Sequence, residues 1–577
     1  MKLDLTFSRQ SLGPDLSSGL TVALVSIPEG MAYALVAGVD PIYGLYTGMV
    51  TTIVASLTGS TSLMIVTLTN ALALVTADAL SNLDGGVDPI TAMFTLTMLV
   101  GAIMFLLGVL RLGSLIRFVS KEVMSGFVFA TALLIVLGQY GELVGYASTL
   151  EDANKLIKAV DITLHISDWD LYTTLLGVGA IIVLLLLKRI RALAKFADVL
   201  IIILAGLFVS IAGWLSVELV GDIAAVPSGL DALPAPVLPD LTLIPGLLIP
   251  AMAAAVVGLA ESSGVGAAYP NPDSSRSNMS QDFTSQGLAN LFGSFFQAMP
   301  AGGSLSRTGI NASGGARTRW SGVSAGILMA VILVFLGTLT ELIPMTALAA
   351  MLVVIGTEAM IKEGRELREA WRVDRVATGA AFVTIVVAIF VDLVVAIFIG
   401  VVLSLLLYSI EAVSQVKALR LIRRNDGKYE KAPVPEKLPS NEATVIMIQG
   451  TIFFATVYSF DDLIPDYRDA HNAVLISHLR GRETIDATTI DWYEKVVPKM
   501  KASGNLLMLS GVEEIVYERL RATEAYELIG EENIFRTQKV IGASMDEALD
   551  AAEKWISERL LQEPTNAAEE EEEIEQL

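Results

Sequence analysis

Residues 377–409 read ATGAAFVTIVVAIFVDLVVAIFIGVVLSLLLYS. The stretch has one charged residue, Asp392, and is long enough for two membrane helices with Asp392 at the turn, because one helix needs about 20 apolar residues to cross a bilayer. Similar apolar runs lie at residues 172–187, 198–219 and 321–338. Together with the glycine and proline breaks between them, these runs predict a polytopic α-helical membrane protein with about 12 to 14 spans.

The composition agrees with membrane insertion. Of the residues, 53% are hydrophobic and 17% are charged, whereas soluble proteins average roughly 45–50% and about 25%. A net charge of -22 argues against a nucleic-acid partner. The absence of cysteine excludes disulfides and thiol catalysis, and three histidines leave little for a zinc site. Because no nucleotide loop, zinc-helix motif or hydrolase elbow is present, we expect neither an enzyme nor a resident cofactor.

The distribution of basic residues predicts the orientation. Basic loops lie at residues 111–121, 188–195, 317–319, 362–375 and 417–424, and the loops between them are acidic or neutral. Since Lys and Arg are retained on the cytoplasmic side, the pattern predicts a multi-pass protein of the cell (plasma or inner) membrane with both termini cytoplasmic. No cleavable signal peptide is evident.

Charge becomes denser after residue 412, which predicts a second domain. We expect a membrane domain at 1–412, a linker at 413–440, a small α/β domain at 441–556 and an acidic disordered tail at 557–577. The α/β assignment depends on β-rich runs at 444–450 and 473–478 that alternate with amphipathic stretches.

Two carboxyl groups lie inside otherwise apolar spans, where polar groups are costly and therefore indicate function. Glu29 lies beside Pro28 and Gly30, which interrupt a helix, and it either contributes to a site or faces a water-filled vestibule at a helix kink. Glu261 lies within the apolar residues 251–268. It either binds a coupling ion, Na+ or a proton, or balances a nearby arginine.

A third polar cluster reads PAGGSLSRTG at residues 300–309. A helix that begins near Ser304 would direct free N–H groups at an anion, with the charge of Arg307 close by. A matching start reads TLTNA at residues 67–71, although Thr69 and Asn70 are also ordinary N-capping residues. Two short helix starts in comparable halves are typical of an inverted-repeat transporter with a midplane site.

These residues resemble the SulP family of inorganic anion transporters, which ends in a STAS domain. The motifs that carry the resemblance are GLTVA at 19–23, IP at 27–28, MAYA at 31–34, GLY at 44–46, NLFGS at 290–294, PAGGSLSRT at 300–308 and GGART at 314–318. The resemblance implies fourteen membrane segments in two inverted repeats of seven, a core domain that moves against a gate domain, and a homodimer.

The resemblance also implies that the anion lies between the starts of the third and tenth helices. With Arg307, the expected binding residues are Tyr33, Thr69, Asn70, Ala71, Gly303, Ser304, Leu305 and Ser306. Glu261 matches the family's acidic position on the eighth helix, which is part of a sodium site in the bicarbonate branch and is tied to proton coupling elsewhere. The sequence departs from the family pattern in having Glu29 where Gln is common and Val265 where a hydroxyl is expected.

The second domain resembles STAS at IDATT, residues 485–489. The resemblance implies a regulatory, phosphorylatable turn at Asp486 and Thr488 and a cytoplasmic partner, although both residues are also ordinary helix starters.

These observations predict a secondary active transporter that moves bicarbonate or sulfate through the lipid bilayer by an elevator-type movement, with Na+ or H+ symport. A cation carried with the anion reduces the net charge moved against the membrane potential, about 2.3 kcal/mol per charge per 100 mV. An uncoupled anion channel or exchanger, a dicarboxylate carrier of the same fold and a nontransporting scaffold remain as alternatives.

Overall fold

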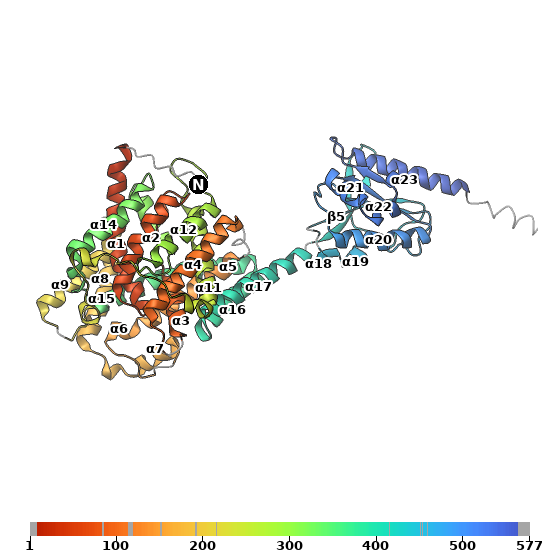
Figure 1. Cartoon of the computed structure of the whole chain (residues 1–577). Coiled ribbons are helices and arrows are strands. Elements are labelled where there is room, and N and C mark those ends of the chain that lie inside the picture. The colour runs from red at the N-terminus through yellow and green to blue at the C-terminus, as the bar shows by residue number, and fades with distance from the viewer. Residues whose placement is uncertain are drawn as a thin grey trace, which may run out of the picture. The chain divides into compact units, whose positions relative to one another are not determined.

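The computed structural model describes residues 9–562 apart from 84–85, 114–118, 151–152, 191–192, 215, 415, 451, 453 and 458–459. The chain divides into two compact units, Met1–Leu405 and Leu406–Leu577. The first unit is helical and the second is built on a β-sheet (Figure 1).

The first unit repeats a set of seven helices. The first seven are α1 (Arg9–Val36), α2 (Pro41–Thr58), α3 (Asn70–Ser81), α4 (Pro89–Val109), α5 (Lys121–Gly138), α8 (Leu171–Arg189) and α9 (Ala197–Ala212). The second seven are α11 (Ile244–Ala268), α12 (Met279–Ser294), α13 (Leu305–Ser313), α14 (Trp320–Thr340), α15 (Met345–Val373), α16 (Arg375–Phe390) and α17 (Leu393–Ser414). Within the described ranges, nine segments are long and apolar enough to cross a membrane. The other five helices of the two sets are shorter or less apolar, namely α2, α3, α12, α13 and α16, so the count of fourteen membrane segments stays a prediction.

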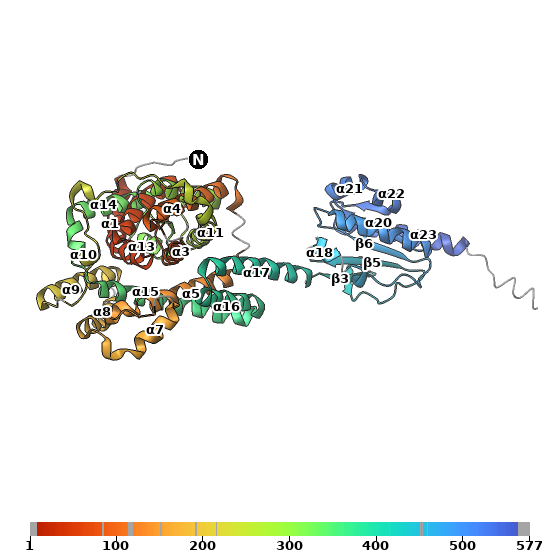
Figure 2. The same ribbon diagram turned by 60° about the horizontal axis from the view of Figure 1, so that its bottom comes forward.

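The helices pack as two bundles, which correspond to the expected core and gate. In the first bundle α1, α2, α4, α11, α12 and α14 pack on one another and enclose α3 and α13. In the second bundle α5 packs on α15 and α16, and α8 packs on α9 and α15. Figure 2 shows the second group as a separate layer beside the first. Contacts of α1 with α9 and α15, and of α3 with α5, join the bundles.

A short antiparallel pair of strands lies at the centre of the first bundle. Strand β1 (Val66–Thr67) pairs with β2 (Gly302–Gly303) immediately before α3 and α13 begin. Glycine is required here because a β-carbon on Gly303 would lie 2.7 Å from the Ser262 hydroxyl oxygen of α11. The pair therefore fixes the two half-helices with their N-termini close together, although they are far apart in the sequence.

The crossing of α1 and α2 gives a test of this packing. A β-carbon on Gly44 would lie 1.9 Å from the carbonyl oxygen of Gly30, so the backbone of one helix would have to move. We expect Gly44→Ala to destabilise the protein by about 3 kcal/mol or more and to lower the midpoint of thermal unfolding in detergent. Gly179 on α8 meets no atom within 4 Å, so Gly179→Ala is the matched control. Equal midpoints for both variants would contradict the close contact.

The second unit contains a six-stranded sheet in the order β4-β3-β5-β6-β7-β8. Its strands are β3 (Lys417–Arg423), β4 (Tyr429–Ala432), β5 (Ala443–Gln449), β6 (Val474–His478), β7 (Leu506–Val512) and β8 (Ile534–Arg536). Strands β5 to β8 are parallel and β3 is antiparallel to both neighbours. The alternating faces of β5 and β6 enter two apolar cores, one with α20 (Ala487–Ala502) and the other with α23 (Ala543–Gln562). The predicted α/β architecture is found.

Two predicted boundaries differ from the structure. The expected linker, 413–440, contributes β3 and β4, because the alternating KALRLIR sequence of β3 pairs along β5. The expected disordered tail, 557–577, begins inside α23, and residues 563–577 lie outside the described residues. The expected limit at 412 falls within α17, which also contains the division between Leu405 and Leu406.

Candidate anion site

The two half-helices α3 and α13 begin with extended, hydroxyl-bearing caps. Thr69 accepts a hydrogen bond from Leu72 N–H at 3.4 Å, and Ser304 accepts one from Arg307 N–H at 3.3 Å. The first backbone hydrogen bonds of the two helices are donated by the N–H groups of Ala73 and Thr308, so the earlier N–H groups have no backbone acceptor within their own helices. The capping interpretation of Thr69 is therefore correct, and it leaves two partly positive helix ends near one point.

A cavity of about 550 Å³ joins these two helix starts. All the predicted site residues of the membrane unit line it except Ala71, and they are Glu29, Tyr33, Thr69, Asn70, Glu261, Gly303, Ser304, Leu305, Ser306 and Arg307. Ala71 is completely buried, and its N–H donates to Asn70 Oδ1 at 2.8 Å. Residues that the sequence analysis expected to form one site therefore line one cavity, although they come from segments more than 200 positions apart in the sequence.

Arg307 is the buried cation of the cavity. Its Nη2 lies 2.7 Å from Glu29 Oε2, and the two side chains are 1% and 6% exposed. Its Nη1 donates to the carbonyl oxygen of Leu68 at 3.1 Å, and the guanidinium lies 5.9 Å from the centre of the Tyr33 ring. Among the described residues, neither Arg307 Nε nor Nη2 forms a hydrogen bond of good geometry, so Nη2 is held by the ion pair with Glu29 alone and Nε has no partner. The guanidinium is thus held in place while one N–H donor remains available to a ligand.

Glu261 belongs to the opposite wall of the cavity. Its Oε2 accepts a hydrogen bond from Thr69 Oγ1 at 2.8 Å, which connects α11 to the start of α3. Arg307 forms its ion pair with Glu29. The alternative in which Glu261 balances the arginine is therefore wrong. Within the described part of the chain, no group of three or more acidic, histidine or cysteine side chains could hold a metal ion.

Polar side chains that hold the β1–β2 pair were not predicted as functional. Ser262 Oγ donates to Gln286 Oε1 at 2.6 Å and accepts Gly303 N–H at 2.9 Å. Asn290 binds both backbone groups of Ala301, through Nδ2 at 2.8 Å and Oδ1 at 2.7 Å. These amides and hydroxyls position the start of α13. In the sequence, Ser262 is in the apolar run that became α11, whereas Asn290 is in the polar sequence of α12 and was quoted only as part of a family motif.

The mouth of the cavity is also charged, and its charged residues were not predicted from the sequence to belong to the site. It is lined by Lys121 of α5 and by Lys362, Glu363 and Glu366 of α15. Lys121 Nζ lies 2.8 Å from Glu366 Oε2, and Lys362 Nζ lies 3.1 Å from Glu363 Oε1. These residues come from the second bundle, so the cavity has one wall from each bundle.

In the second unit, Asp486 caps α20. Its Oδ1 accepts the N–H of Thr489 at 2.9 Å and the Thr489 hydroxyl. The helix-starting interpretation of Asp486 is therefore correct, while Thr488 is half-buried in the first turn. A regulatory role for this turn stays a prediction.

Comparisons with known proteins agree with this geometry. The sulfate permease family matches residues 12–387, and the STAS domain matches residues 434–540. The chain belongs to the sulfate permease family. It is 30% identical over 564 residues to "Probable sulfate transporter 4.2" of Arabidopsis thaliana, covering 90% of this chain and 79% of that protein. Sulfate transporter 4.1, chloroplastic, of the same plant is 28% identical over 558 residues, covering 90% and 78%.

Solved structures share the fold. The overall structure of SLC26A9 has a TM-score of 0.82 at 17% identity, covering 97% of this chain and 92% of that one. The transmembrane domain of the cyanobacterium bicarbonate transporter BicA has a TM-score of 0.56 at 20% identity, covering 70% and 98%. The expected family and fold class are confirmed: the chain is a multi-pass membrane anion transporter with a C-terminal STAS domain, and it is not an enzyme.

Proposed function

We propose that the chain imports sulfate together with protons, and that the anion binds between the starts of α3 and α13. The observation that carries the proposal is the buried Arg307, whose Nε donor is unused among the described residues beside two helix N-termini. An oxyanion at this point would accept charge-assisted hydrogen bonds in a site that excludes much of the water. The names of the plant relatives support sulfate as the oxyanion.

Charge balance favours protons as the coupling ion. Beside one arginine the cavity already holds two acids, Glu29 and Glu261, so a dianion would bring the local charge to about -3 if both acids were ionised. Such an excess is expensive in a buried site. One proton on each acid would reduce the local charge to about -1 and would leave Arg307 free of competition from Glu29. The import of two protons with sulfate would then move no net charge across the membrane.

The surroundings of Glu261 argue against sodium. Na+ prefers several oxygen ligands, as other hard cations do. Val265, one turn after Glu261, is completely buried in an apolar cluster with Met64, Val66 and Ala301. The position where the family pattern has a hydroxyl therefore offers no ligand, while a single carboxyl with a Thr69 donor is sufficient to hold a proton.

The two bundles suggest how the anion moves. Both helix starts belong to the first bundle, and Lys121 and Lys362 of the second bundle line the mouth of the cavity. Movement of the first bundle against the second would carry the anion as an elevator does. Since basic residues are retained inside the cell, we assign the mouth to the cytoplasm and the structure to an inward-facing state, with both termini cytoplasmic in the cell membrane. A homodimer and a cytoplasmic partner of the STAS domain also belong to this proposal.

Uptake into proteoliposomes tests the substrate and the coupling. Labelled sulfate, bicarbonate and succinate are supplied separately with an inward proton gradient, an inward sodium gradient or neither. We expect sulfate to accumulate about 100-fold above equilibrium with a proton gradient of one pH unit, because each of the two protons carried contributes a factor of about ten. Sodium-dependent bicarbonate uptake would contradict the proposal and favour carbon acquisition. Competition by succinate would indicate a dicarboxylate carrier, and a large current that no cation gradient changes would indicate a channel.

A further inference from the structure

A second cavity of about 490 Å³ lies between the two bundles and shares no lining residue with the anion cavity. From the first bundle it is lined by the end of α1 and by α3 from Leu74 to Ser81. The other wall comes from α5, from α7 (Lys155–Leu164) and from the turn between α16 and α17. Because α3 begins at the anion site and ends here, this cavity marks the opposite end of the elevator path.

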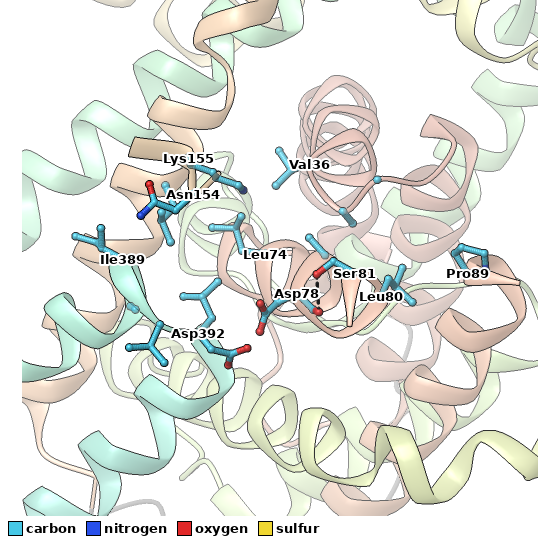
Figure 3. A pocket seen from close by; sticks show the side chains of 17 residues that line it. Val36, Leu74, Asp78, Leu80, Ser81, Pro89, Asn154, Lys155, Ile389 and Asp392 are labelled. Carbon is cyan, nitrogen blue, oxygen red and sulfur yellow. Dashed lines mark hydrogen bonds between the residues drawn. The ribbon is translucent and has the colours of Figure 1, made fainter. Parts of the chain in front are cut away.

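Two carboxyl groups meet in this cavity across the bundle boundary. Asp78 is on α3 of the first bundle, and Asp392 is in the turn between α16 and α17 of the second. Figure 3 shows both carboxyl groups facing the same part of the cavity, and they are close enough for a side-chain hydrogen bond. Asp392 Oδ1 also accepts the N–H of Val395 at 2.9 Å.

One oxygen of Asp78 has no donor. Asp78 Oδ2 is buried and accepts no hydrogen bond from any described residue, although the backbone N–H of Val394 donates to the Asp78 carboxyl. Two ionised carboxylates in this position repel each other, whereas one proton between them converts the contact into a hydrogen bond. One proton on the pair therefore gives the buried carboxyl oxygen a hydrogen-bond partner and removes the repulsion.

The other charge that faces the pair is Lys155, the first residue of α7. The pKa of Lys155 is lowered to about 8, mainly by burial and less by Lys158, against the opposite effect of Asp78. Lys155 therefore offsets part of the carboxylate repulsion at neutral pH and less of it in alkali. The rest of the described cavity lining, from α1, α4 and α5, is uncharged.

We propose that Asp78 and Asp392 share one proton and form a pH-sensitive latch that holds the two bundles together at this end. The proton binds the latched arrangement more tightly than a separated pair, so acid on this side stabilises closure and alkali favours opening. The latch rests on the proposed bundle movement. Acid outside the cell would then have two opposite effects. Protonation of Glu261 would drive symport, whereas protonation of the Asp78–Asp392 pair would slow the separation of the two bundles.

The absence of cysteine from the chain allows a direct measurement. Spin labels on Asn82→Cys and Phe390→Cys report the distance between the exposed end of α3 and the exposed end of α16 by double electron–electron resonance in nanodiscs. From about pH 5 to 8, we expect the population with the long distance to rise relative to the population with the short distance. The ratio of the two populations should change by up to about tenfold per pH unit, which is the slope for the release of one proton.

Three variants separate the latch from other titrating groups. Asp78→Asn keeps a donor toward Asp392, so we expect the short distance at every pH. Asp88→Asn removes an exposed carboxyl, the cap of α4, and is the matched control, with wild-type pH dependence. Glu261→Gln removes the coupling acid but leaves the carboxyl pair intact, so the pH dependence that remains in this variant belongs to Asp78 and Asp392.

The outcomes distinguish the two proposals. A distance that responds to sulfate but not to pH would overturn the latch and leave the bundle movement in place. Equal pH dependence in Asp78→Asn and wild type would also overturn the latch. Distances that respond to neither sulfate nor pH would overturn the latch and the proposed movement together.

Discussion

Replacing Arg307 with glutamine should lower sulfate uptake by at least about 30-fold, which corresponds to about 2 kcal/mol. Among the described residues that line the cavity, the basic ones are Arg307, Lys121 and Lys362. The two lysines are at the mouth, so Arg307 supplies the full positive charge beside the two helix starts. Initial rates of labelled sulfate uptake into proteoliposomes, at matched protein content, measure the effect.

The ion pair with Glu29 requires a control for folding. Arg307→Gln leaves the buried Glu29 carboxylate without its partner, and loss of one member of such a pair destabilises a protein by about 3–5 kcal/mol. The double variant Glu29→Gln/Arg307→Gln removes both charges and should recover a wild-type unfolding midpoint without recovering uptake. Uptake by the double variant at the wild-type rate would show that the anion binds elsewhere.

Replacing Glu261 with glutamine should separate transport from its driving force. The amide oxygen of glutamine can still accept the hydrogen bond from Thr69, so the start of α3 keeps its support, but the side chain no longer binds or releases a proton. We expect sulfate accumulation driven by a proton gradient of one pH unit to fall about tenfold at zero membrane potential, because one of the two coupled protons is lost and each contributes a factor of about ten. Exchange of internal for external sulfate should stay within about threefold of wild type.

The same experiment distinguishes coupling from binding. Exchange needs the anion site but no net proton movement, so it reports whether the site is intact. Undiminished proton-driven accumulation by Glu261→Gln would mean that neither coupled proton binds to Glu261. Loss of exchange together with accumulation would mean that Glu261 is needed for anion binding itself.

Much of the fold was predictable because hydrocarbon imposes strong patterns on a sequence. Long apolar runs mark the spans, and the polar starts at Thr69 and Ser304 interrupt them where a half-helix must begin. The residues around these starts were correctly expected to lie together, since inverted repeats bring corresponding breaks to the midplane. The STAS domain was identifiable from its alternating β-strands and from a resemblance at residues 485–489.

The side-chain partners were not predictable in the same way. Spacing does not reveal that Arg307 pairs with Glu29 and not with Glu261, because the choice depends on how α1, α11 and α13 pack. Asp78 was not predicted as functional, because an acid near the end of a helix, as in α3, resembles a loop residue in the sequence. Strand β3 was assigned to a linker because its basic residues hide the alternation that pairs it with β5.

The most direct test of the central claim is the number of protons taken up when sulfate binds to the purified protein. Isothermal titration calorimetry in buffers of different ionisation enthalpy gives this number. We expect uptake of one to two protons per sulfate near neutral pH, no requirement for sodium, and about one proton fewer for Glu261→Gln. Sulfate binding without proton uptake, or binding that needs sodium, would contradict it.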